Sequence, residues 1–432
     1  MASRLSPDRS PWFWVPSLFF TQGLPYTIAT IVSVVMYKRL GISNADITLY
    51  TGWLFLPWGL RAIWSPIIEY FHTKRFWIVW MELCLGVCMA LVAFSIPGPY
   101  FFQLSLAFFW LLGFSSSLHD MSTDSLYMMS LTTREQAYFA GFRNVFYRLA
   151  VISAQGLLVI VAGNLENYLQ DIPRAWCMCM GLVAVVFLCS FVWHKVFLPQ
   201  PEMDLLQEPV SSLSWDKLLR PFRAYFQRDQ IGLLMLFLLF YRVGETQLVK
   251  MIPPFLLDNA SLGGMGMETS RVGVNYGTVG MIAMIVGGYL GGVIINWKGL
   301  RTSLWLMFFS MNVPNLAYAV IAAYPPQEIA WVNLVIFIEQ FGFGMAFTVF
   351  LMILIVTVKG EYQTSHFALS TGFMTLGMIF PSMISGWVQE QLGYVWFFTY
   401  ACICSLPCLW ITYKMGFHPD ILRTEFSPER SN

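Results

Sequence analysis

Twelve long apolar stretches occupy nearly the whole of this 432-residue chain. A helix that crosses the hydrocarbon core of a bilayer needs about 20 apolar residues, and each stretch has roughly that length. Hydrocarbon offers the backbone no hydrogen-bond partner, so a spanning segment must pair its N–H and C=O groups internally, as a helix does. The sequence therefore predicts an all-α polytopic membrane protein with spans near residues 12–36, 50–70, 76–96, 100–130, 136–162, 174–198, 231–256, 271–296, 302–324, 330–357, 364–390 and 394–415.

The composition agrees with a membrane protein. Hydrophobic residues make up 57% of the chain and charged residues 11%. With a mean hydropathy of +0.61, these values exclude an ordinary soluble globule. The N-terminal region has no short apolar core followed by a small-residue cleavage site, so we expect the first span to stay in the mature protein. An even number of spans then places both termini on one side of the membrane.

The basic residues set the expected orientation. Most of the 25 Lys and Arg residues fall in the termini or in loops on the side of the termini. Few fall in loops on the opposite side, namely Lys38, Arg39, Arg174 and Arg271. Because cytoplasmic loops carry an excess of Lys and Arg, this asymmetry predicts that both termini are cytoplasmic.

A long polar segment, residues 199–230, divides the spans into an N-terminal half, 1–198, and a C-terminal half, 231–432, with six spans each. Within it, residues 213–226 alternate apolar and basic side chains at helical spacing, which predicts an amphipathic linker helix on the cytoplasmic membrane surface. Weak internal repeats support the division: 20–25 resembles 241–246, and 137–140 resembles 365–368. Two six-helix halves are typical of major facilitator transporters, whose substrate site lies near the membrane midplane.

The chain has eight cysteines, all within predicted spans that are outer ones in the facilitator arrangement. Free cysteine is a small hydrophobe that packs well in such helices. The spacing matches neither a disulfide framework nor a zinc site. We therefore expect packing roles for these residues, with no bound metal and no cofactor.

Charges inside the fourth and fifth spans are the first functional signal, because a charge at bilayer depth costs several kcal/mol and is rarely kept without a use. His119, Asp120 and Asp124 lie in the fourth span, and the i, i+4 spacing puts both aspartates on one helix face, about 6 Å apart along the axis. Asp120 lies 14 residues before Arg134, and Arg148 lies 14 residues after it. Two antiparallel helices joined there bring Asp120 and Arg148 to similar depth, so we predict an ion pair.

Further spans carry charges as well. Arg242 and Glu245 have i, i+3 spacing in the seventh span, and Lys250 follows near its outer end. Glu339 lies in the tenth span and Arg61 in the second. The alternative interpretation is that these charges pair with one another and only fix helix packing.

Three charged residues have a more structural interpretation. Asp124 lies near the cytoplasmic end of its span, where it is expected to meet the basic pair Lys74 and Arg75 as part of a gate. Lys250 is expected to snorkel its ammonium group toward the outer interface. Glu82, in the third span, is expected to be a buried hydrogen-bonding group outside the substrate site.

At these residues the chain resembles the AmpG muropeptide permeases, a family in the peptide/acetyl-CoA transporter branch of the major facilitators. The resemblance covers roughly residues 17 to 400. It rests on Gly23-Leu24-Pro25, Leu60-Arg61-Ala62-Ile63-Trp64-Ser65-Pro66, His119-Asp120 with Asp124, Tyr147-Arg148-Leu149, Tyr241-Arg242-Val243-Gly244-Glu245, Pro314-Asn315-Leu316, and Glu339 ahead of Gly342-Phe343-Gly344-Met345. These motifs are specific for the branch and less specific for the transported solute.

The resemblance implies a proton-coupled importer of anhydromuropeptides, the glycopeptide fragments shed during wall turnover, in the inner membrane of a Gram-negative bacterium. Arginine binds carboxylates, and a buried carboxyl whose protonation responds to a neighbouring arginine suits proton coupling. We expect substrate-binding residues at Gln22, Arg61, His119, Arg148 and Arg242. We expect proton-coupling residues at Asp120, Glu245 and Glu339.

The motifs also depart from the family pattern. His119 stands where the family has Gln, Arg61 and Arg242 stand where it has Lys, and Glu245 stands where it has Asp. Arg and Lys differ in the geometry with which they bind anions. A symporter for another solute, such as an amino sugar, an oligosaccharide, an acyl-CoA or a siderophore, therefore remains the alternative.

Other functional classes have less support. The sequence contains no HExxH or GxSxG motif that would indicate a membrane-embedded protease or hydrolase, so we do not expect an enzyme. A non-transporting sensor would be expected to carry an appended soluble domain. We expect a monomer in the lipid bilayer, with a small anionic glycopeptide or sugar and protons as its partners and no nucleic acid.

Overall fold

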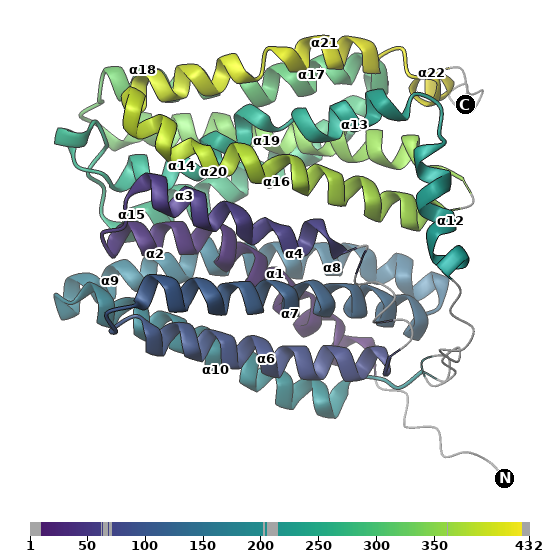
Figure 1. The fold of residues 1–432 in the computed structure, drawn as a ribbon, viewed down its shortest axis with the longest axis horizontal. Coiled ribbons are helices and arrows are strands. Elements are labelled where there is room, and N and C mark those ends of the chain that lie inside the picture. The colour runs from purple at the N-terminus through teal and green to yellow at the C-terminus, as the bar shows by residue number, and fades with distance from the viewer. Residues whose placement is uncertain are drawn as a thin grey trace. The chain divides into compact units, whose positions relative to one another are not determined.

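The structure, a computed structural model, describes residues 10–61, 63, 68, 71–201, 204, 215–360 and 362–425. All regular secondary structure in these ranges is helical, as predicted (Figure 1). The contacts divide the chain into two compact units. Unit 1 comprises Met1–Leu40 and Leu60–Leu218, and unit 2 comprises Gly41–Gly59 and Leu219–Asn432.

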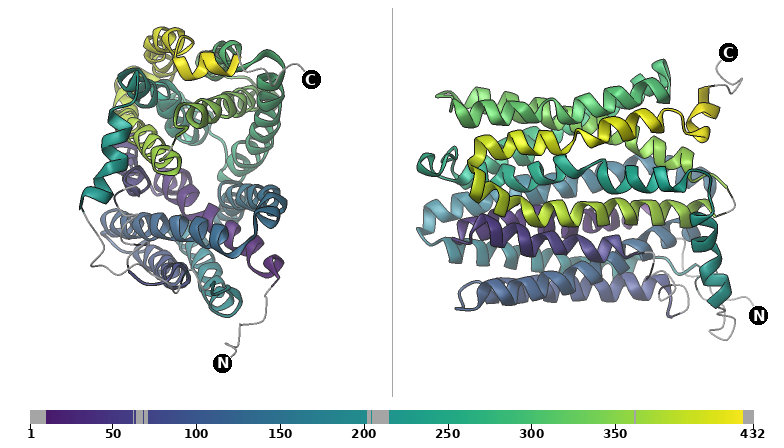
Figure 2. Two further views of the ribbon diagram at one scale, coloured as in Figure 1. Left: turned by 90° about the vertical axis from the view of Figure 1, so that its right-hand side faces the viewer. Right: turned by 45° about the horizontal axis from the view of Figure 1, so that its top comes forward.

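Unit 1 consists of long helices that run alongside one another (Figure 2). Helix α6 packs against α7 and α10, and α1 packs against α8 and α7. Two π-helical turns, η2 and η4, interrupt the first and fifth spans and contact each other. The elements are η1 (Pro11–Phe13), α1 (Val15–Thr27), η2 (Ile28–Val32), α2 (Ser33–Arg39), α6 (Lys74–Ser95), α7 (Phe101–Ser130), α8 (Thr133–Ile152), η4 (Ser153–Leu158), α9 (Val159–Leu169) and α10 (Ile172–Phe197).

Unit 2 has the same style of packing, with α19 against α16 and α17, and α20 against α3, α14 and α18. A third π-helical segment, η7, lies near the start of the eighth predicted span of the chain, between α15 and α16. The elements are α3 (Asn44–Gly52), η3 (Trp53–Phe55), α4 (Leu56–Gly59), α12 (Trp215–Phe226, which begins in unit 1), α13 (Ile231–Phe240), α14 (Val243–Leu257), η6 (Ala260–Leu262), α15 (Thr269–Val272), η7 (Gly273–Gly280), α16 (Met281–Lys298), α17 (Leu300–Asn312), α18 (Asn315–Ala323), α19 (Ile329–Thr357), α20 (Gln363–Cys404), α21 (Pro407–Met415) and α22 (Pro419–Glu425).

Ten helical segments among the described residues are long and apolar enough to cross a membrane. The first predicted span matches Pro11–Arg39, and the third to the tenth predicted spans each match one further segment. The last two predicted spans both lie within Ser365–Met415, as two helices that are separated at Gly393, where φ of +72° and ψ of 168° are non-helical. The second predicted span is divided among α3, η3, α4 and residues that include undescribed positions, so it does not form one of the ten segments.

The second span also begins earlier than predicted, at Asn44, after Ser43 caps the helix by accepting a hydrogen bond from the Asp46 N–H at 3.0 Å. The polar start of α3 is buried against α20. Asn44 donates to Gln389 at 2.7 Å, and the N–H of Gly386 donates to Thr48 at 2.9 Å. These contacts group residues 41–59 with unit 2, whereas the chain order had placed them in the half comprising 1–198.

A close helix crossing orders the centre of unit 1. A Cβ atom built on Gly23 of α1 would lie 2.8 Å from the carbonyl oxygen of Tyr147 and 2.8 Å from Cβ of Ala150, both on α8. Only glycine allows this approach, because a side chain would force the two helices apart. Around this crossing, α1 contributes Leu18 and Phe19 to an apolar core.

Helix α12 occupies the place of the predicted linker helix and is anchored to unit 2. Tyr225 is fully buried, its ring stacks on Phe373, and its hydroxyl lies 2.9 Å from that of Ser370. Burial raises the pKa of the Tyr225 hydroxyl. Just after the helix, Arg228 contacts Nδ1 of His366 at 3.2 Å and donates to the carbonyl of Lys359 at 3.1 Å. The end of the linker is therefore held by α20.

Candidate functional site

Three predicted site residues of unit 1 gather around one tyrosine. Asp120, Arg148 and Arg61 all interact electrostatically with the hydroxyl of Tyr147, which precedes Arg148 on α8. Arg148 and Arg61 are partly buried, and the Asp120 side chain is 14% exposed. The structure thus brings the predicted Asp120 and Arg148 into one region, together with the arginine from the second predicted span.

Gln22 lies beside the α1–α8 crossing. Its side chain is buried, and its Oε1 atom has no hydrogen-bond partner among the described residues. A buried amide oxygen without a partner carries a desolvation cost of about 1–3 kcal/mol, which a bound ligand can relieve. Two sequence motifs therefore meet here, Gly23-Leu24-Pro25 and Tyr147-Arg148-Leu149.

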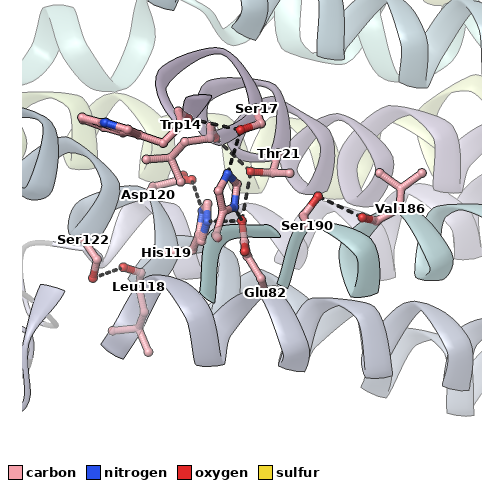
Figure 3. A network of polar contacts seen from close by, with 12 residues as sticks. Trp14, Ser17, Thr21, Glu82, Leu118, His119, Asp120, Ser122, Val186 and Ser190 are labelled. Atoms are coloured by element: carbon pink, nitrogen blue, oxygen red, sulfur yellow. Dashed lines mark hydrogen bonds and ion pairs between the residues drawn. The ribbon is translucent and has the colours of Figure 1, made fainter. Parts of the chain in front are cut away.

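A second polar group in unit 1 is centred on Glu82 of α6 (Figure 3). Its Oε1 atom lies 2.6 Å from Nδ1 of His194, 3.4 Å from Nε2 of His119, and accepts a hydrogen bond from Thr21 at 3.2 Å. The side chains of Glu82, His119 and His194 are fully buried. Nε2 of His194 in turn lies 2.9 Å from the hydroxyl of Ser17. We call Glu82, His119 and His194 the buried triad.

His119 connects the buried triad to Asp120, since its Nδ1 atom lies 4.0 Å from Oδ1 of Asp120. The contact between His119 of α7 and Glu82 of α6 is closed to solvent, because both side chains are inaccessible. The expectation that Glu82 is a buried hydrogen-bonding group is confirmed. Sequence reasoning missed His194, which forms the shortest contact of the group; the signal was a histidine inside an otherwise apolar span.

The predicted gate residues have different partners from those expected. Asp124 pairs with Arg143 of α8 at 2.7 Å, not with the basic pair at the start of α6. The guanidinium of Arg143 also lies over the ring of Phe19, 4.6 Å from its centroid. At α6, Lys74 donates through Nζ to the carbonyl of Ile68 at 2.8 Å, and Arg75 donates to the carbonyl of Lys195 at 2.6 Å. Arg143 lies about three helix turns into α8, and Asp124 lies about two turns before the end of α7, so the two side chains meet across the neighbouring helices.

In unit 2, Arg242 and Glu245 form a two-point ion pair. Nε and Nη2 of Arg242 donate to the two carboxylate oxygens at 2.9 and 3.1 Å. The side chains are 11% and 3% exposed. The seventh span breaks here, because α13 ends at Phe240 and α14 begins at Val243. Glu245 therefore lies in the first turn of α14, where the helix dipole favours a negative charge.

Glu339 of α19 forms a second buried carboxylate site in unit 2. It accepts hydrogen bonds from Gln340 at 2.9 and 3.1 Å and from the hydroxyl of Tyr318 at 3.5 Å. Glu339 and Glu245 are close enough for their charges to interact, and both act on Tyr276. The two carboxylates of unit 2 therefore lie in one electrostatically connected region around Tyr276.

Comparisons with known proteins identify the family. The sequence pattern of the Major Facilitator Superfamily matches residues 15–380. The chain belongs to the Major Facilitator Superfamily. It is 24% identical to a protein named as transporter AmpG 4 of Rickettsia conorii, over 91% of this chain and 94% of that protein. It is 22% identical to the anhydromuropeptide permease of Escherichia coli K12, over 91% of this chain and 77% of that protein. The resemblance to AmpG permeases is confirmed.

Solved structures show the same fold. The nucleoside transporter NupG superposes with a TM-score of 0.70 at 13% identity, covering 93% of this chain and 98% of that one. A bacterial homolog of the human lysosomal transporter Spinster superposes with a TM-score of 0.68 at 14% identity, covering 99% and 100%. The prediction of a major facilitator fold is confirmed.

This major facilitator protein has two more polar groups in unit 2 whose partners the sequence did not predict. Lys250 was expected to snorkel outward, but this was wrong: it is 3% exposed and donates to the hydroxyl of Thr51 at 3.1 Å. Asp258, at the end of α14, accepts a hydrogen bond from Tyr394 at 2.6 Å, and Asn44 lies 3.4 Å from the same oxygen. Each group joins α3 to α14, an arrangement that only the packing of helices reveals.

Proposed function

We propose that this protein is a proton-coupled importer of anhydromuropeptides in the inner membrane of a Gram-negative bacterium, with both termini in the cytoplasm. The named relatives, AmpG 4 and anhydromuropeptide permease, match over about nine-tenths of the chain. The excess of Lys and Arg on one side supports the orientation. The substrate is then an anionic glycopeptide, which needs cationic groups for its carboxylates and apolar faces for its sugar rings.

The Arg242–Glu245 pair carries the proposal most directly. A guanidinium that already holds one carboxylate at two points is geometrically suited to hold another. The rings of Phe343 and Phe347 lie 5.4 and 5.9 Å from the Arg242 guanidinium and offer apolar surface beside it. When Glu245 takes up a proton, its hold on Arg242 weakens, and a carboxylate of the substrate takes its place. Proton binding thereby favours substrate binding.

Asp120 and Glu339 are the other two proposed proton carriers. Asp120 shares its surroundings with Arg148 and Arg61, so the arrival of a substrate carboxylate at these arginines would favour protonation of Asp120. The carboxylates of Glu339 and Glu245 repel each other electrostatically. We propose that Arg61, Arg148, Arg242 and Gln22 bind substrate. For His119, full burial against Glu82 favours a role inside the protein over contact with substrate.

The test is uptake of labelled anhydromuropeptide into proteoliposomes with an imposed pH gradient, acidic outside. We expect accumulation that a protonophore abolishes and that removal of sodium leaves unchanged. Competition by free amino sugars and by acetyl-CoA separates the proposed substrate from the alternatives. Uptake that survives the protonophore but requires sodium would contradict proton coupling, and complete competition by one of the other solutes would reassign the substrate.

A single variant tests the role of Arg242. Arg242→Gln should weaken uptake of the peptide-bearing substrate far more than uptake of an uncharged sugar fragment. The reason is that a hydrogen bond to a charged group contributes about 1.5–3 kcal/mol. Arg301→Gln is a matched control, because Arg301 lies on α17 with its guanidinium over the ring of Phe417. Equal losses for both substrates would indicate that Arg242 acts only in packing.

A further inference from the structure

The buried triad combines two histidines with one carboxylate, and the proposed function assigns it no role. It places two imidazoles against one carboxylate oxygen, with His194 at 2.6 Å and His119 at 3.4 Å from Oε1 of Glu82. The four residues of the connected group, counting Asp120, come from α6, α7 and α10, and α1 adds Ser17 and Thr21 (Figure 3). Histidine ordinarily titrates near pH 6.5, inside the physiological range.

We propose that the buried triad, reached through Asp120, is a proton-binding site of the transporter in which His119 and His194 each take up one proton. This rests on the proposed function only for its use in coupling; the binding of protons itself does not depend on which solute is carried.

The surroundings of His119 favour the protonated ring. An imidazolium has an N–H at both ring nitrogens, whereas a neutral imidazole has one N–H donor and one acceptor. In the structure, Nε2 faces Glu82 at 3.4 Å and Nδ1 faces Asp120 at 4.0 Å. Protonated His119 therefore presents a donor to each carboxylate. Neutral His119 leaves a lone pair facing one of them, which is repulsive when that carboxylate is ionised.

His194 has two consistent protonation states, which differ in the direction of one hydroxyl. The Ser17 hydroxyl lies 2.9 Å from Nε2 of His194 and also 3.3 Å from the carbonyl oxygen of Trp14. In the neutral state, Nδ1–H donates to Glu82 and the Ser17 hydroxyl donates to Nε2. In the protonated state, Nε2–H donates to Ser17, and the Ser17 hydroxyl turns to donate to Trp14. Every donor finds an acceptor in both states, so one proton is gained without loss of a hydrogen bond.

Protonation of the histidines supplies the cations that Glu82 lacks. Asp120 already shares its surroundings with Arg148 and Arg61. When both rings are neutral, the fully buried Glu82 carboxylate has no cation in contact with it among the described residues, a costly arrangement inside a membrane protein. The route to solvent is Asp120, whose side chain is 14% exposed while that of His119 is inaccessible. A proton passes from hydronium in the solvent to the Asp120 carboxylate, which breaks one O–H bond and forms another, and then to Nδ1 of His119, which breaks the Asp120 O–H bond and forms an N–H bond.

The other charged groups on the surrounding helices have their own contacts. Asp124 is paired with Arg143, Lys74 donates to a carbonyl, and the ammonium of Lys195 lies 5.7 Å from the ring centroid of Phe191. On α1, the groups facing the triad are hydroxyls, which do not titrate in this range. Arg148 on α8 and Arg61 interact with Tyr147 in the region of Asp120 and have no proton to exchange in this pH range. Near the triad, Asp120 is therefore the group expected to exchange protons with it.

The first experiment observes the imidazoles directly in the full-length protein in detergent. The chain has only five histidines, so ¹⁵N-histidine NMR resolves them, and His119→Gln and His194→Gln assign the two resonances. We expect both rings to pass from one protonated nitrogen to two as the pH falls from about 8 to 5. Asp120→Asn should change the resonance of Nδ1 of His119, because that atom faces Asp120 at 4.0 Å. Rings that keep one state across this range would overturn the proposal, whatever solute the protein carries.

The second experiment separates coupling from structure by comparing Glu82→Gln with Thr21→Val. Both changes weaken the contacts of Oε1 of Glu82, but only Glu82→Gln removes the negative charge that stabilises the two imidazolium ions. In proteoliposomes loaded with anhydromuropeptide, Glu82→Gln should keep exchange of labelled for unlabelled substrate and lose accumulation driven by the pH gradient. Thr21→Val should keep both. Full accumulation by Glu82→Gln, or an equal loss in Thr21→Val, would show that the triad is only structural. Absence of all uptake in the wild type would instead refute the proposed function and leave the NMR result standing.

Discussion

The Arg242–Glu245 pair gives the sharpest quantitative prediction. Arg242→Gln removes a guanidinium that contacts both oxygens of a carboxylate whose side chain is 3% exposed. Removal of one member of a buried ion pair costs about 3–5 kcal/mol, because the other charge is left without its partner. Loss of the guanidinium over Phe343 adds about 0.5–1 kcal/mol.

Two features reduce this cost. Glu245 lies in the first turn of α14, where the helix dipole stabilises a carboxylate by about 0.3–1 kcal/mol. The Gln side chain can also donate one neutral hydrogen bond, worth about 1 kcal/mol. We therefore expect Arg242→Gln to lower the free energy of unfolding by about 3 kcal/mol. Glu245→Gln should cost less, because the Arg242 side chain left behind is more exposed, at 11%.

The double variant Arg242→Gln/Glu245→Gln tests the reasoning. Both charges are then absent, so the penalty for an unpaired buried charge disappears and the double variant should be more stable than Arg242→Gln alone. The free energy of unfolding is measured by titrating the detergent-solubilised protein with SDS and following its intrinsic fluorescence. We expect a coupling energy of at least about 2 kcal/mol between the two sites. Additivity within about 0.5 kcal/mol would refute the ion pair as a stabilising unit.

Three further predictions concern helix packing and pH. Gly23→Ala should destabilise the protein by about 1–3 kcal/mol, because the new Cβ would lie 2.8 Å from the Tyr147 carbonyl oxygen. The control Gly141→Ala on α8 should not destabilise it, because a Cβ there meets nothing within 4 Å. Equal shifts in melting temperature for the two variants would contradict this reasoning. Tyr394→Phe removes the 2.6 Å hydrogen bond to Asp258 and should cost about 1.5–3 kcal/mol in the same SDS titration, a loss that the exposed Tyr413→Phe should not reproduce. Burial lowers the pKa of His418, so the folded state resists protonation; its contribution is complete above about pH 6.5 and is lost as the pH falls through the lower folded pKa. His418→Asn should therefore lessen the drop in melting temperature between pH 7.5 and 5.5, and an unchanged drop would exclude His418 as its source.

The sequence alone determined the class of protein and the position of nearly every span. Hydropathy suffices for this because hydrocarbon imposes helices on any long apolar stretch, whatever its neighbours. The intramembrane charges were equally visible, since their cost at bilayer depth depends on composition and depth. Arg242 and Glu245 were also predictable as neighbours from their i, i+3 spacing, which still brings them together although Arg242 is the N-cap of α14 and not inside a helix.

Partners on different helices were decided only by tertiary structure. Asp124 was expected near Lys74 and Arg75 but pairs with Arg143, since helix rotation and not sequence distance decides which of several cations is met. Glu82 and His194 lie 112 residues apart.

The second span shows the same limit. Asn44 and Gln389 are 345 residues apart, and their contact lies in a polar segment at the start of α3. The span predicted from hydropathy begins too late to include this segment. Hydropathy records what each residue prefers on its own, whereas a buried polar group is stable only where another helix supplies its partner. Which helix supplies it depends on close crossings such as that of Gly23 on α8, and these are set by the packing of the whole unit.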